Sequence, residues 1–429
     1  MSTATTELRS PRSLHQLGVF CGLAAGAWLG AAEAPTKLVQ TGISPFVITL
    51  GMVAGVFVAR WTVPLILKGS GFVFEDLRVN AHLILWALLA GMLWVVANTL
   101  TVFAIRDVGL AIAFPLWNTN SLVGILWGWL FFNELRGAGA KGWLKVVGGA
   151  FAIVAGTSLL AYATTHANPA DHSRAVQGVI AALGAGVLWG TQYIPYRKAY
   201  ISGVNPLSFV TVIAFGELIA AVALGSFFQG GIAPLFRDLA AARTVLFWLF
   251  LGGFCWVFGD LFQQYAAKYI GIGRGIPLSN TNQLWGLAWG ALVFGEFAHL
   301  RAASITMVVA GSVIMILGAA AISMASASAS ELTSWTAAMN RECSRYSLDP
   351  QRVARAVAGD HHLDHRARSG PRWEILALVV AASMLTGLAL IARHPAIRID
   401  TAWMFALLAG ALLLLGISGA LLWHRTRFS

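Results

Sequence analysis

The chain has 429 residues, of which 58% are hydrophobic and only 11% are charged, and its formal net charge is +11. About a quarter of the residues of a soluble domain are charged, and a soluble globule of this size could not hide so much apolar surface. In a membrane protein a basic excess is typical of cytoplasmic loops, so the charge does not indicate a nucleic-acid partner.

Apolar stretches of about 18 or more residues recur along the chain, and this is the length that crosses a bilayer as a helix. No signal-peptide pattern precedes the first stretch, because Ala31-Ala32 is followed by Glu33, Pro35 and Lys37 instead of a clean cleavage site. The sequence therefore predicts an all-α integral membrane protein. The twelve predicted spans lie near residues 17–34, 46–67, 81–105, 109–132, 143–163, 176–194, 206–228, 245–267, 275–294, 302–324, 374–392 and 401–423.

Lys and Arg are concentrated in the loops that share one side of the membrane with the N-terminus, above all in residues 325–372. The positive-inside rule places such loops in the cytoplasm. We therefore expect a multi-pass protein of the cytoplasmic (inner) membrane with both termini in the cytoplasm.

Two parts of the chain repeat each other. Gly26 and Gly30 recur at Gly186 and Gly190, at an offset of 160 residues. The third and fourth spans recur at an offset of 162, and the matched residues are Gly91, Trp94, Gly109, Pro115, Asn118, Thr119, Asn120, Gly124, Gly128 and Glu134 with Gly253, Trp256, Gly271, Pro277, Asn280, Thr281, Asn282, Gly286, Gly290 and Glu296. Identity in register over this length indicates a duplication.

Each copy holds five spans, and an odd number makes the second copy enter the membrane from the opposite side. The sequence thus predicts a ten-helix core of two inverted five-helix repeats, an architecture typical of secondary transporters. Two extra C-terminal transmembrane helices follow the core. The predicted segments are an N-tail (1–16), the first repeat (17–163), the second, inverted repeat (176–324), a basic cytoplasmic linker (325–372) and a two-helix hairpin (373–423).

Two segments carry a resemblance to a known family. They are GVLWGTQYIPYRK (186–198) and PLSNTNQLWGLAWGALVFGE (277–296), and they resemble the drug/metabolite transporter superfamily. Within it the chain is most similar to the glucose/ribose porter branch and its carbohydrate-transporter relatives, and less similar to ureide permeases. The resemblance covers residues 17–324 and implies a ten-helix carrier for a small polar solute, whereas the linker and the last two spans depart from this pattern.

Polar residues follow a proline at matching places in the two copies. Proline loosens the preceding helical turn, and irregular backbone at membrane depth persists only beside protein or a water-filled cavity. Amides both donate and accept without charge, which suits hydroxyl-rich ligands, although hydrogen bonding between helices is the alternative role. Tryptophan rings can stack on a sugar, with plain packing as their alternative. The predicted solute-binding residues are Asn118, Thr119, Asn120, Asn280, Thr281, Asn282, Gln283, Gln264, Trp256 and Trp189.

Asp260 lies near the middle of a predicted span and shares a helix face with Gln264. An isolated acid at this depth costs a few kcal/mol unless it is protonated or paired. It is our predicted coupling residue, which would carry a proton or bind a cation, and a silent buried acid is the alternative. Glu217 and Glu33 are secondary candidates. Glu134 and Glu296 lie at helix ends near basic residues, where an orienting or gating ion pair is expected.

Small residues one turn apart allow helices to approach closely where lipid gives no hydrophobic drive to association. We expect such packing and hinge positions at Gly26, Gly30, Gly186, Gly190, Gly124, Gly128, Gly286, Gly290, Pro115 and Pro277.

The linker is predicted to form an amphipathic surface helix over 331–358, with arginines available to anionic lipid headgroups. His361, His362 and His365 invite a metal site, but no cysteine stands at zinc-site spacing, so no metal is expected. No phosphate-binding loop motif occurs, which argues against ATP as the direct energy source. We expect no cofactor.

Together these features predict a secondary active transporter, not an enzyme, that moves a sugar or a similar small neutral polar metabolite by alternating access. Its expected partners are the solute, membrane lipid and a proton or other cation as coupling ion. The sequence leaves open whether a coupling ion is used and whether the chain forms a homo-oligomer. The alternatives are a carrier for purine-related or ureide-type metabolites, a membrane-embedded enzyme and a non-transporting sensor.

Overall fold

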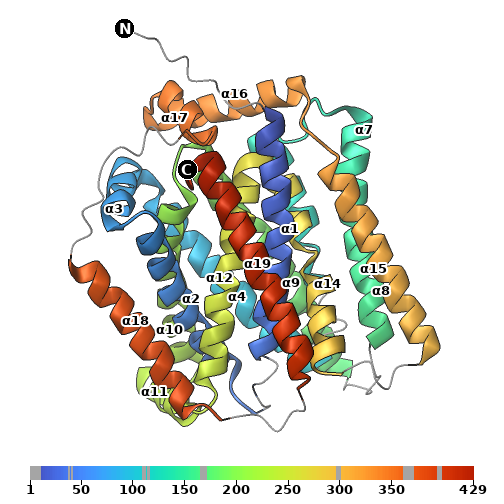
Figure 1. Ribbon diagram of the computed structural model, residues 1–429, viewed down its shortest axis with the longest axis vertical. Helices are drawn as coiled ribbons and strands as arrows, with labels where there is room; N and C mark the ends of the chain where they lie inside the picture. The colour runs from blue at the N-terminus through green and yellow to red at the C-terminus, as the bar shows by residue number, and fades with distance from the viewer. Residues whose placement is uncertain are drawn as a thin grey trace.

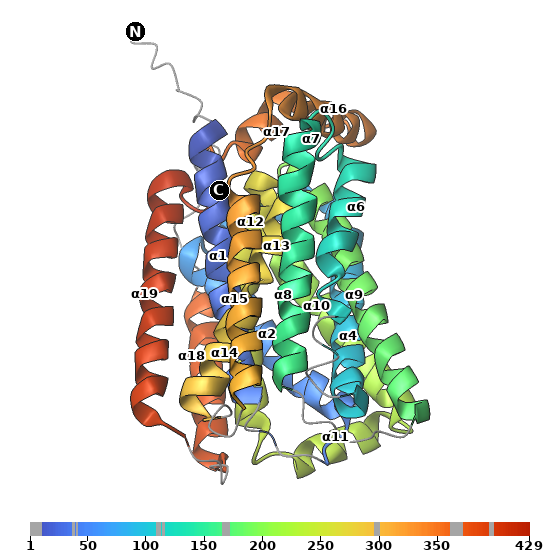
Figure 2. The same cartoon turned by 90° about the vertical axis from the view of Figure 1, so that its right-hand side faces the viewer.

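The computed structural model describes residues 11–36, 39, 42–108, 113, 116–164, 172–295, 301–360, 372–393 and 399–429. Within these ranges the regular structure is helical and contains no strand, which confirms the all-α prediction for them. Long helices stand side by side as a bundle, and short helices lie across its two ends (Figures 1 and 2).

In the described part of the chain, nine helices are long and apolar enough to cross a membrane. Eight of the spans are single helices or nearly so, and one is formed by two helices joined through a π-helical turn. The elements are α1 (Pro11–Thr36), α2 (Pro45–Leu67), α4 (Ile84–Val108), α7 (Gly139–Trp143) with η2 (Leu144–Gly148) and α8 (Gly149–Thr164), α10 (Pro206–Phe228), α12 (Leu246–Ile270), α15 (Ala302–Ser323), α18 (Arg372–Ile391) and α19 (Thr401–Thr426).

The other three predicted spans differ from these nine. In 109–132, the described helix α6 (Asn120–Phe132) has only 13 residues. The span 176–194 lies inside the 30-residue helix α9 (His172–Ile201), which carries more polar side chains than its neighbours. The span 275–294 is divided among α13 (Ile272–Ser279), α14 (Asn282–Ala288) and the π-helical η3 (Trp289–Val293). Its interruption falls on the polar residues that the sequence places there.

The central helices pack through glycines. In the core, α2 packs against α10 and α12, α1 against α12, and α4 against α9 and α10. A side chain at Gly253 would collide with the carbonyl oxygen of Met52 on α2, and one at Gly91 with the carbonyl oxygen of Ile213 on α10. These helices therefore meet backbone to backbone, as small residues permit in membranes.

One end of the bundle is covered by α16 (Ala329–Tyr346) and α17 (Pro350–Val357), with α3 (Ser70–Val79) beside them (Figure 1). We call this end, covered by residues 329–357, the capped end. Near it α1 begins, where His15 Nε2 lies 2.9 Å from the Ser323 carbonyl at the end of α15. By contrast α9 ends there, where Lys198 pairs with Glu342 of α16. At the opposite end lies α11 (Ile232–Ala241) (Figure 2).

The linker forms two helices where the sequence predicted one. Its first helix, α16, ends at Ser347, which has a left-handed backbone with φ of 54°. Asp349 then begins the second helix, because its side chain accepts a hydrogen bond of 2.9 Å from the Gln351 amide. This local capping bond explains the break between α16 and α17.

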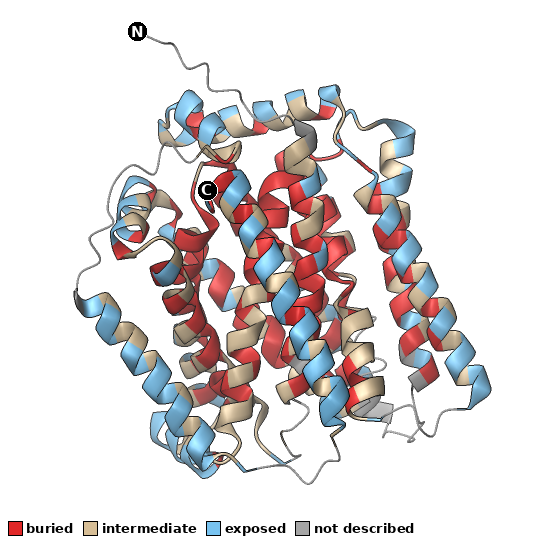
Figure 3. Cartoon of the chain, viewed as in Figure 1, coloured by how far each residue is buried: buried red, intermediate tan, exposed pale blue. Residues whose placement is uncertain are grey.

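Burial is concentrated in the middle of the bundle, and exposed residues are frequent on α18, α19, the outer faces of α8 and α15, and the short helices at both ends (Figure 3). The exposed residues on these helices are largely apolar, among them Ile375, Leu376 and Leu413. Apolar side chains on the outside of such a bundle suit contact with lipid.

Candidate functional site

Three charged side chains from three helices meet inside the bundle. Arg60 of α2 donates a hydrogen bond of 2.8 Å from Nη2 to Asp260 Oδ2 of α12. Its Nη1 lies 3.3 Å from Glu217 Oε1 of α10. All three side chains have an exposed fraction of 0%. We call Arg60, Glu217 and Asp260 the central charge cluster.

The cluster lies away from both ends of its helices. Arg60 is about two turns, and Glu217 and Asp260 are each about three turns, from the capped end of their helices. Close packing at Gly216 holds α10 against α4, because a side chain there would collide with Leu88. The charges are therefore fixed at depth by tightly packed helices.

The members of the cluster are hydrogen-bonded to different degrees. Asp260 Oδ2 accepts a second hydrogen bond of 2.8 Å from Gln264 Nε2, so these two residues share a face as predicted. Tyr200 of α9 in turn donates from its hydroxyl to Gln264 Oε1. Asp260 Oδ1, Arg60 Nε and both carboxylate oxygens of Glu217 have no hydrogen-bond partner among the described residues. A buried polar group without a hydrogen bond lowers the stability of the fold by about 1–3 kcal/mol. Such groups in a native structure often have a functional role, which makes this cluster a candidate site.

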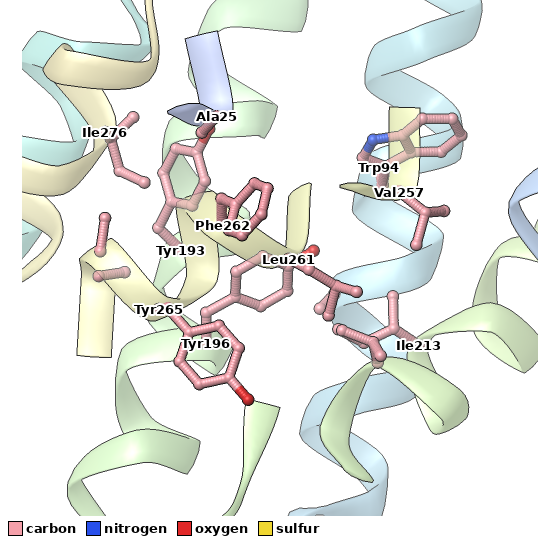
Figure 4. Packing of buried hydrophobic residues seen from close by; sticks show 14 of the residues in the cluster. Ala25, Trp94, Tyr193, Tyr196, Ile213, Val257, Leu261, Phe262, Tyr265 and Ile276 are labelled. Carbon is pink, nitrogen blue, oxygen red and sulfur yellow. The ribbon is translucent and has the colours of Figure 1, made fainter. Parts of the chain in front are cut away.

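Aromatic rings surround the cluster. The Trp256 ring centroid lies 5.6 Å from Arg60 Cζ, a cation–π distance, and the Trp94 ring lies 5.0 Å from that of Trp256. Tyr193 and Tyr196 of α9 and Phe262 of α12 converge on the same interior (Figure 4). The matched residues Trp94 and Trp256 thus meet at the cluster, one from each predicted copy.

Trp189 lies between two apolar clusters. Its ring is 6.0 Å from that of Trp117, in a smaller apolar cluster between α4 and α9. It also packs against the main apolar core, which Trp256 borders as well.

The two predicted polar stretches, 118–120 and 280–283, lie against each other. Asn280 Nδ2 donates to Asn120 Oδ1 at 2.9 Å and to Ser121 Oγ at 2.5 Å. The Thr119 and Thr281 hydroxyls each donate to the carbonyl three residues earlier, at 2.6 Å and 2.8 Å. Most of these polar groups are thus bonded to protein in this conformation, Asn280 across to the other stretch and the threonines within their own segment.

Other members of these stretches are less fully bonded. Asn118 Nδ2 has no partner among the described residues, and Gln283 bonds only weakly to Asn282 at 3.3 Å. On the neighbouring helix, Gln263 donates to Ser279 Oγ at 2.6 Å. This hydrogen bond joins α12 to the last residue of α13, directly before the break between α13 and α14.

The predicted glycines of α1 and α9 face the polar stretches 281–286 and 117–123. A Cβ at Gly30 would lie 2.6 Å from Asn282 O and 3.0 Å from the Gly286 amide, and one at Gly190 2.5 Å from Val123. One at Gly26 would collide with the Thr281 hydroxyl. The remaining glycines are placed as follows: Gly186 faces Thr119, Gly124 faces Tyr193, Gly128 faces Glu134, and Gly290 is buried in η3.

Pro277 lies within α13. The remaining candidates fall outside the described residues, namely Pro115, Glu296, His361, His362, His365 and the side chain of Glu33.

A second charged group lies at the capped end. Glu134 follows α6 between Asn133 and Leu135, whose backbones are left-handed with φ of 57° and 61°. Its carboxylate accepts from the Ile272 and Gly273 amides at 3.0 Å and 2.8 Å, at the start of α13, and lies 2.9 Å from Arg197 Nε. The backbone strain therefore aims Glu134 at a helix N-terminus, where a negative charge is favourable.

The capped end also binds α16 to the core. Arg274 of α13 forms a bidentate pair with Glu331 at 2.7 Å and 2.8 Å, and its Nε donates to the Ala325 carbonyl at 2.7 Å. Glu331 also accepts from the Leu135 amide at 2.9 Å. Lys198 Nζ lies 2.5 Å from Glu342. The acidic side chains of α16 thus face the core, while its arginines Arg341 and Arg345 are exposed.

Sequence analysis gave Arg60, which lies inside the predicted span 46–67, no role. The available signal was that a charge within an apolar stretch needs a partner, and the acids well inside predicted spans, away from their ends, were Glu217 and Asp260. Their meeting requires contacts across about 160–200 positions of sequence, which no local pattern encodes.

Comparisons with known proteins agree with the sequence resemblance. Residues 176–323 match the model of the EamA-like transporter family, which confirms for this segment the resemblance to the drug/metabolite transporter superfamily. A protein of Lactobacillus johnsonii named "Putative sugar uptake protein" is 31% identical over 104 residues, which are 23% of this chain and 36% of that protein. The match thus spans about a third of that relative's length. A protein of known crystal structure is 17% identical, with a TM-score of 0.45, over 69% of this chain and 95% of that one.

Proposed function

We propose that this chain is a secondary active transporter that moves a sugar or a similar small neutral polar metabolite across the membrane by alternating access. The match of residues 176–323 to a transporter family supports transport, and the partial match to a protein named for sugar uptake supports the substrate class. The observation that carries the proposal is the central charge cluster, where incompletely bonded buried charges from three helices meet beside aromatic rings.

The proposal includes a core of two inverted five-helix copies. Helix packing supports it, since contacts have counterparts when the copies are exchanged: α1 with α12 corresponds to α9 with α4, α2 with α12 to α10 with α4, and α1 with α14 to α9 with α6. The opposite directions of α1 and α9 relative to the capped end also support inversion. Two such copies can exchange conformations and open a site to either side.

Movement would use the glycine contacts and the helix breaks. The glycines of α1 face residues 281–286 and those of α9 face residues 117–123, so each first helix slides against the polar stretch of the other copy. The amides of these stretches would exchange their mutual hydrogen bonds for bonds to solute hydroxyls. Gln264 and Trp256 would contribute from α12, the amide by hydrogen bonding and the ring by stacking.

Coupling to a proton would use the central charge cluster. It contains two carboxylates and one guanidinium, so full ionisation leaves one negative charge in excess. Charge buried at membrane depth is costly, and binding one proton makes the cluster neutral. Proton binding and the exchange of conformations would then be linked through the same three helices.

Counterflow in proteoliposomes tests the function. Vesicles containing the purified chain are loaded with unlabelled D-glucose, D-ribose or a polyol, and uptake of the labelled compound is followed without an ion gradient. A carrier accumulates label transiently, whereas vesicles without protein do not. Absence of counterflow with sugars and polyols, together with counterflow of a purine or ureide, would replace the substrate class. Absence with all of them would reject transport of these solutes.

A further inference from the structure

Within the central charge cluster, we propose that Glu217 carries the coupling proton and that Asp260 is the fixed counter-ion that positions Arg60. This inference deepens the proposed function and rests on it for its transport consequences. It changes the expectation from sequence, which gave the coupling role to Asp260.

Asp260 is held in its charged form by its bonds. One oxygen, Oδ2, accepts both from Arg60 Nη2 and from Gln264 Nε2, each at 2.8 Å. Gln264 is itself fixed, because its other amide atom accepts from the Tyr200 hydroxyl. Hydrogen bonds to a charged carboxylate favour that form, and two charge-assisted bonds to one oxygen make it a stable partner of the guanidinium.

Glu217 has no comparable support. Its contact with the guanidinium is an ion-pair distance of 3.3 Å, and neither of its oxygens accepts a hydrogen bond from the described residues. Its side chain is as completely buried as that of Asp260. Protonation of a buried carboxylate breaks the hydrogen bonds that it accepts as an anion. Glu217 accepts none from the described residues, so its protonation costs less interaction energy than that of Asp260.

The surroundings of Glu217 supply one positive group and one competing acid. Arg60 reaches it from α2, and Asp260 acts on it from α12. Tyr196 of α9 is the further titratable side chain that interacts with it. Helix α4, on the other side, presents backbone at Gly91 close to the Glu217 amide. The charged residues of α3 and α11 lie at the two ends of α10, away from Glu217.

The proton step is a simple exchange with water. A hydronium ion on one side gives a proton to an oxygen of Glu217 and becomes water, which leaves Arg60 and Asp260 as a neutral ion pair. After the conformations exchange, Glu217 returns the proton to water on the other side, and its carboxylate again competes for Arg60. No electrons or other groups move.

Infrared spectroscopy tests the assignment without a substrate. The purified protein in lipid vesicles is titrated with acid, and the carbonyl band of a protonated carboxylic acid is recorded in difference spectra. We expect Glu217→Gln to remove a titrating band. Asp260→Asn should retain this band but at a lower pH, because Glu217 is then the only carboxylate that pairs with Arg60. Asp107→Asn at the end of α4 serves as a matched control and should leave the band unchanged. Size-exclusion chromatography checks that each variant is folded.

Three outcomes overturn the assignment: the band persists in Glu217→Gln, both core variants remove it, or the wild type has no such band. If Glu217→Gln does not fold, Glu217→Asp replaces it. This variant moves the carboxyl by one methylene, so the band should titrate at a different pH, and an unchanged titration overturns the proposal.

A transport assay is the second test of the assignment. In counterflow-active vesicles, Glu217→Gln should lose accumulation driven by a pH gradient while it keeps exchange of labelled sugar. Retained gradient-driven accumulation would overturn the assignment. If counterflow fails for every solute although the infrared band behaves as expected, the proposed function fails and the protonation site stands. If solute accumulation by the wild type responded to Na⁺ gradients instead of pH gradients, the assignment of a coupling proton to Glu217 would also be overturned.

Discussion

The central charge cluster and the capped end both bury ion pairs between helices. The two regions differ in how many polar atoms of these pairs have a hydrogen-bond partner. At the capped end, Arg274 uses Nη1, Nη2 and Nε, and Glu331 accepts from both a guanidinium and a backbone amide. At the centre, Arg60 Nε, Asp260 Oδ1 and the Glu217 oxygens have no hydrogen bond among the described residues. A complete set of bonds fixes one arrangement, whereas an incomplete set leaves partners that can be exchanged.

The largest loss of stability is expected at the capped end, where the polar atoms of the ion pair between Arg274 and Glu331 are hydrogen-bonded. Glu331→Ala leaves the buried Arg274 guanidinium without its carboxylate, and breaking a buried ion pair in this way costs about 3–5 kcal/mol. We expect a large loss of thermal stability by differential scanning fluorimetry in detergent. Arg345→Ala, on the exposed face of the same helix, is the matched control and should change little. Equal stability of the two variants would show that α16 does not hold the core.

Two truncated chains distinguish the contribution of α16 and α17 to stability from that of α18 and α19. A chain that stops after Ser326 loses Glu331 as well as α18 and α19, whereas one that stops after Asp360 keeps α16 and α17. The first should be less stable by about the cost of the lost ion pair, roughly 3–5 kcal/mol. Thermal unfolding and size-exclusion profiles measure the difference. If both truncations behave alike, the capped end contributes less than its geometry indicates.

A substitution that disturbs the helix contact beside the central charge cluster should cause an intermediate loss of stability. Gly253→Ala places a methyl group against the Met52 carbonyl, which the backbone must move to accommodate. Overpacking typically costs about 1–3 kcal/mol. Gly387→Ala on α18, where a Cβ would meet nothing within 4 Å, is the control. Thermal unfolding should order the variants accordingly, and an undisturbed Gly253→Ala would contradict close α2–α12 packing.

The smallest effect on stability is expected at the polar stretches. Asn280→Ala loses the bonds to Asn120 and Ser121, and interhelical hydrogen bonds in membranes average about 0.6 kcal/mol each. Asn118→Ala, whose Nδ2 is unbonded among the described residues, should cost less. Counterflow then distinguishes the roles of Asn280. If its loss abolishes exchange at unchanged stability, it binds solute, and if exchange is normal, it only joins helices.

Much of the architecture follows from local sequence signals. Apolar length predicted twelve spans, and the described residues contain nine helices long and apolar enough to be spans. The spacing of Asp260 and Gln264 predicted their shared face. The spacing of Gly26 and Gly30, and of Gly186 and Gly190, suggested close helix contacts, and these glycines lie close to residues 279–286 and 116–123. These features are local because about 20 apolar residues determine a span and four residues one turn, whatever lies elsewhere in the chain.

The partners of the buried charges were decided by the tertiary structure alone. Asn98 and Asp260 lie 162 positions apart, the offset of the repeat, and both face α2. Asn98 bonds weakly to Thr49 at 3.4 Å, whereas Asp260 pairs with Arg60. Likewise Glu331, in a linker expected to lie on lipid, reaches Arg274 within the core. The physical reason is that an ion pair depends on how helices are packed and rotated against each other, and composition and spacing specify only which face of its own helix each charge occupies.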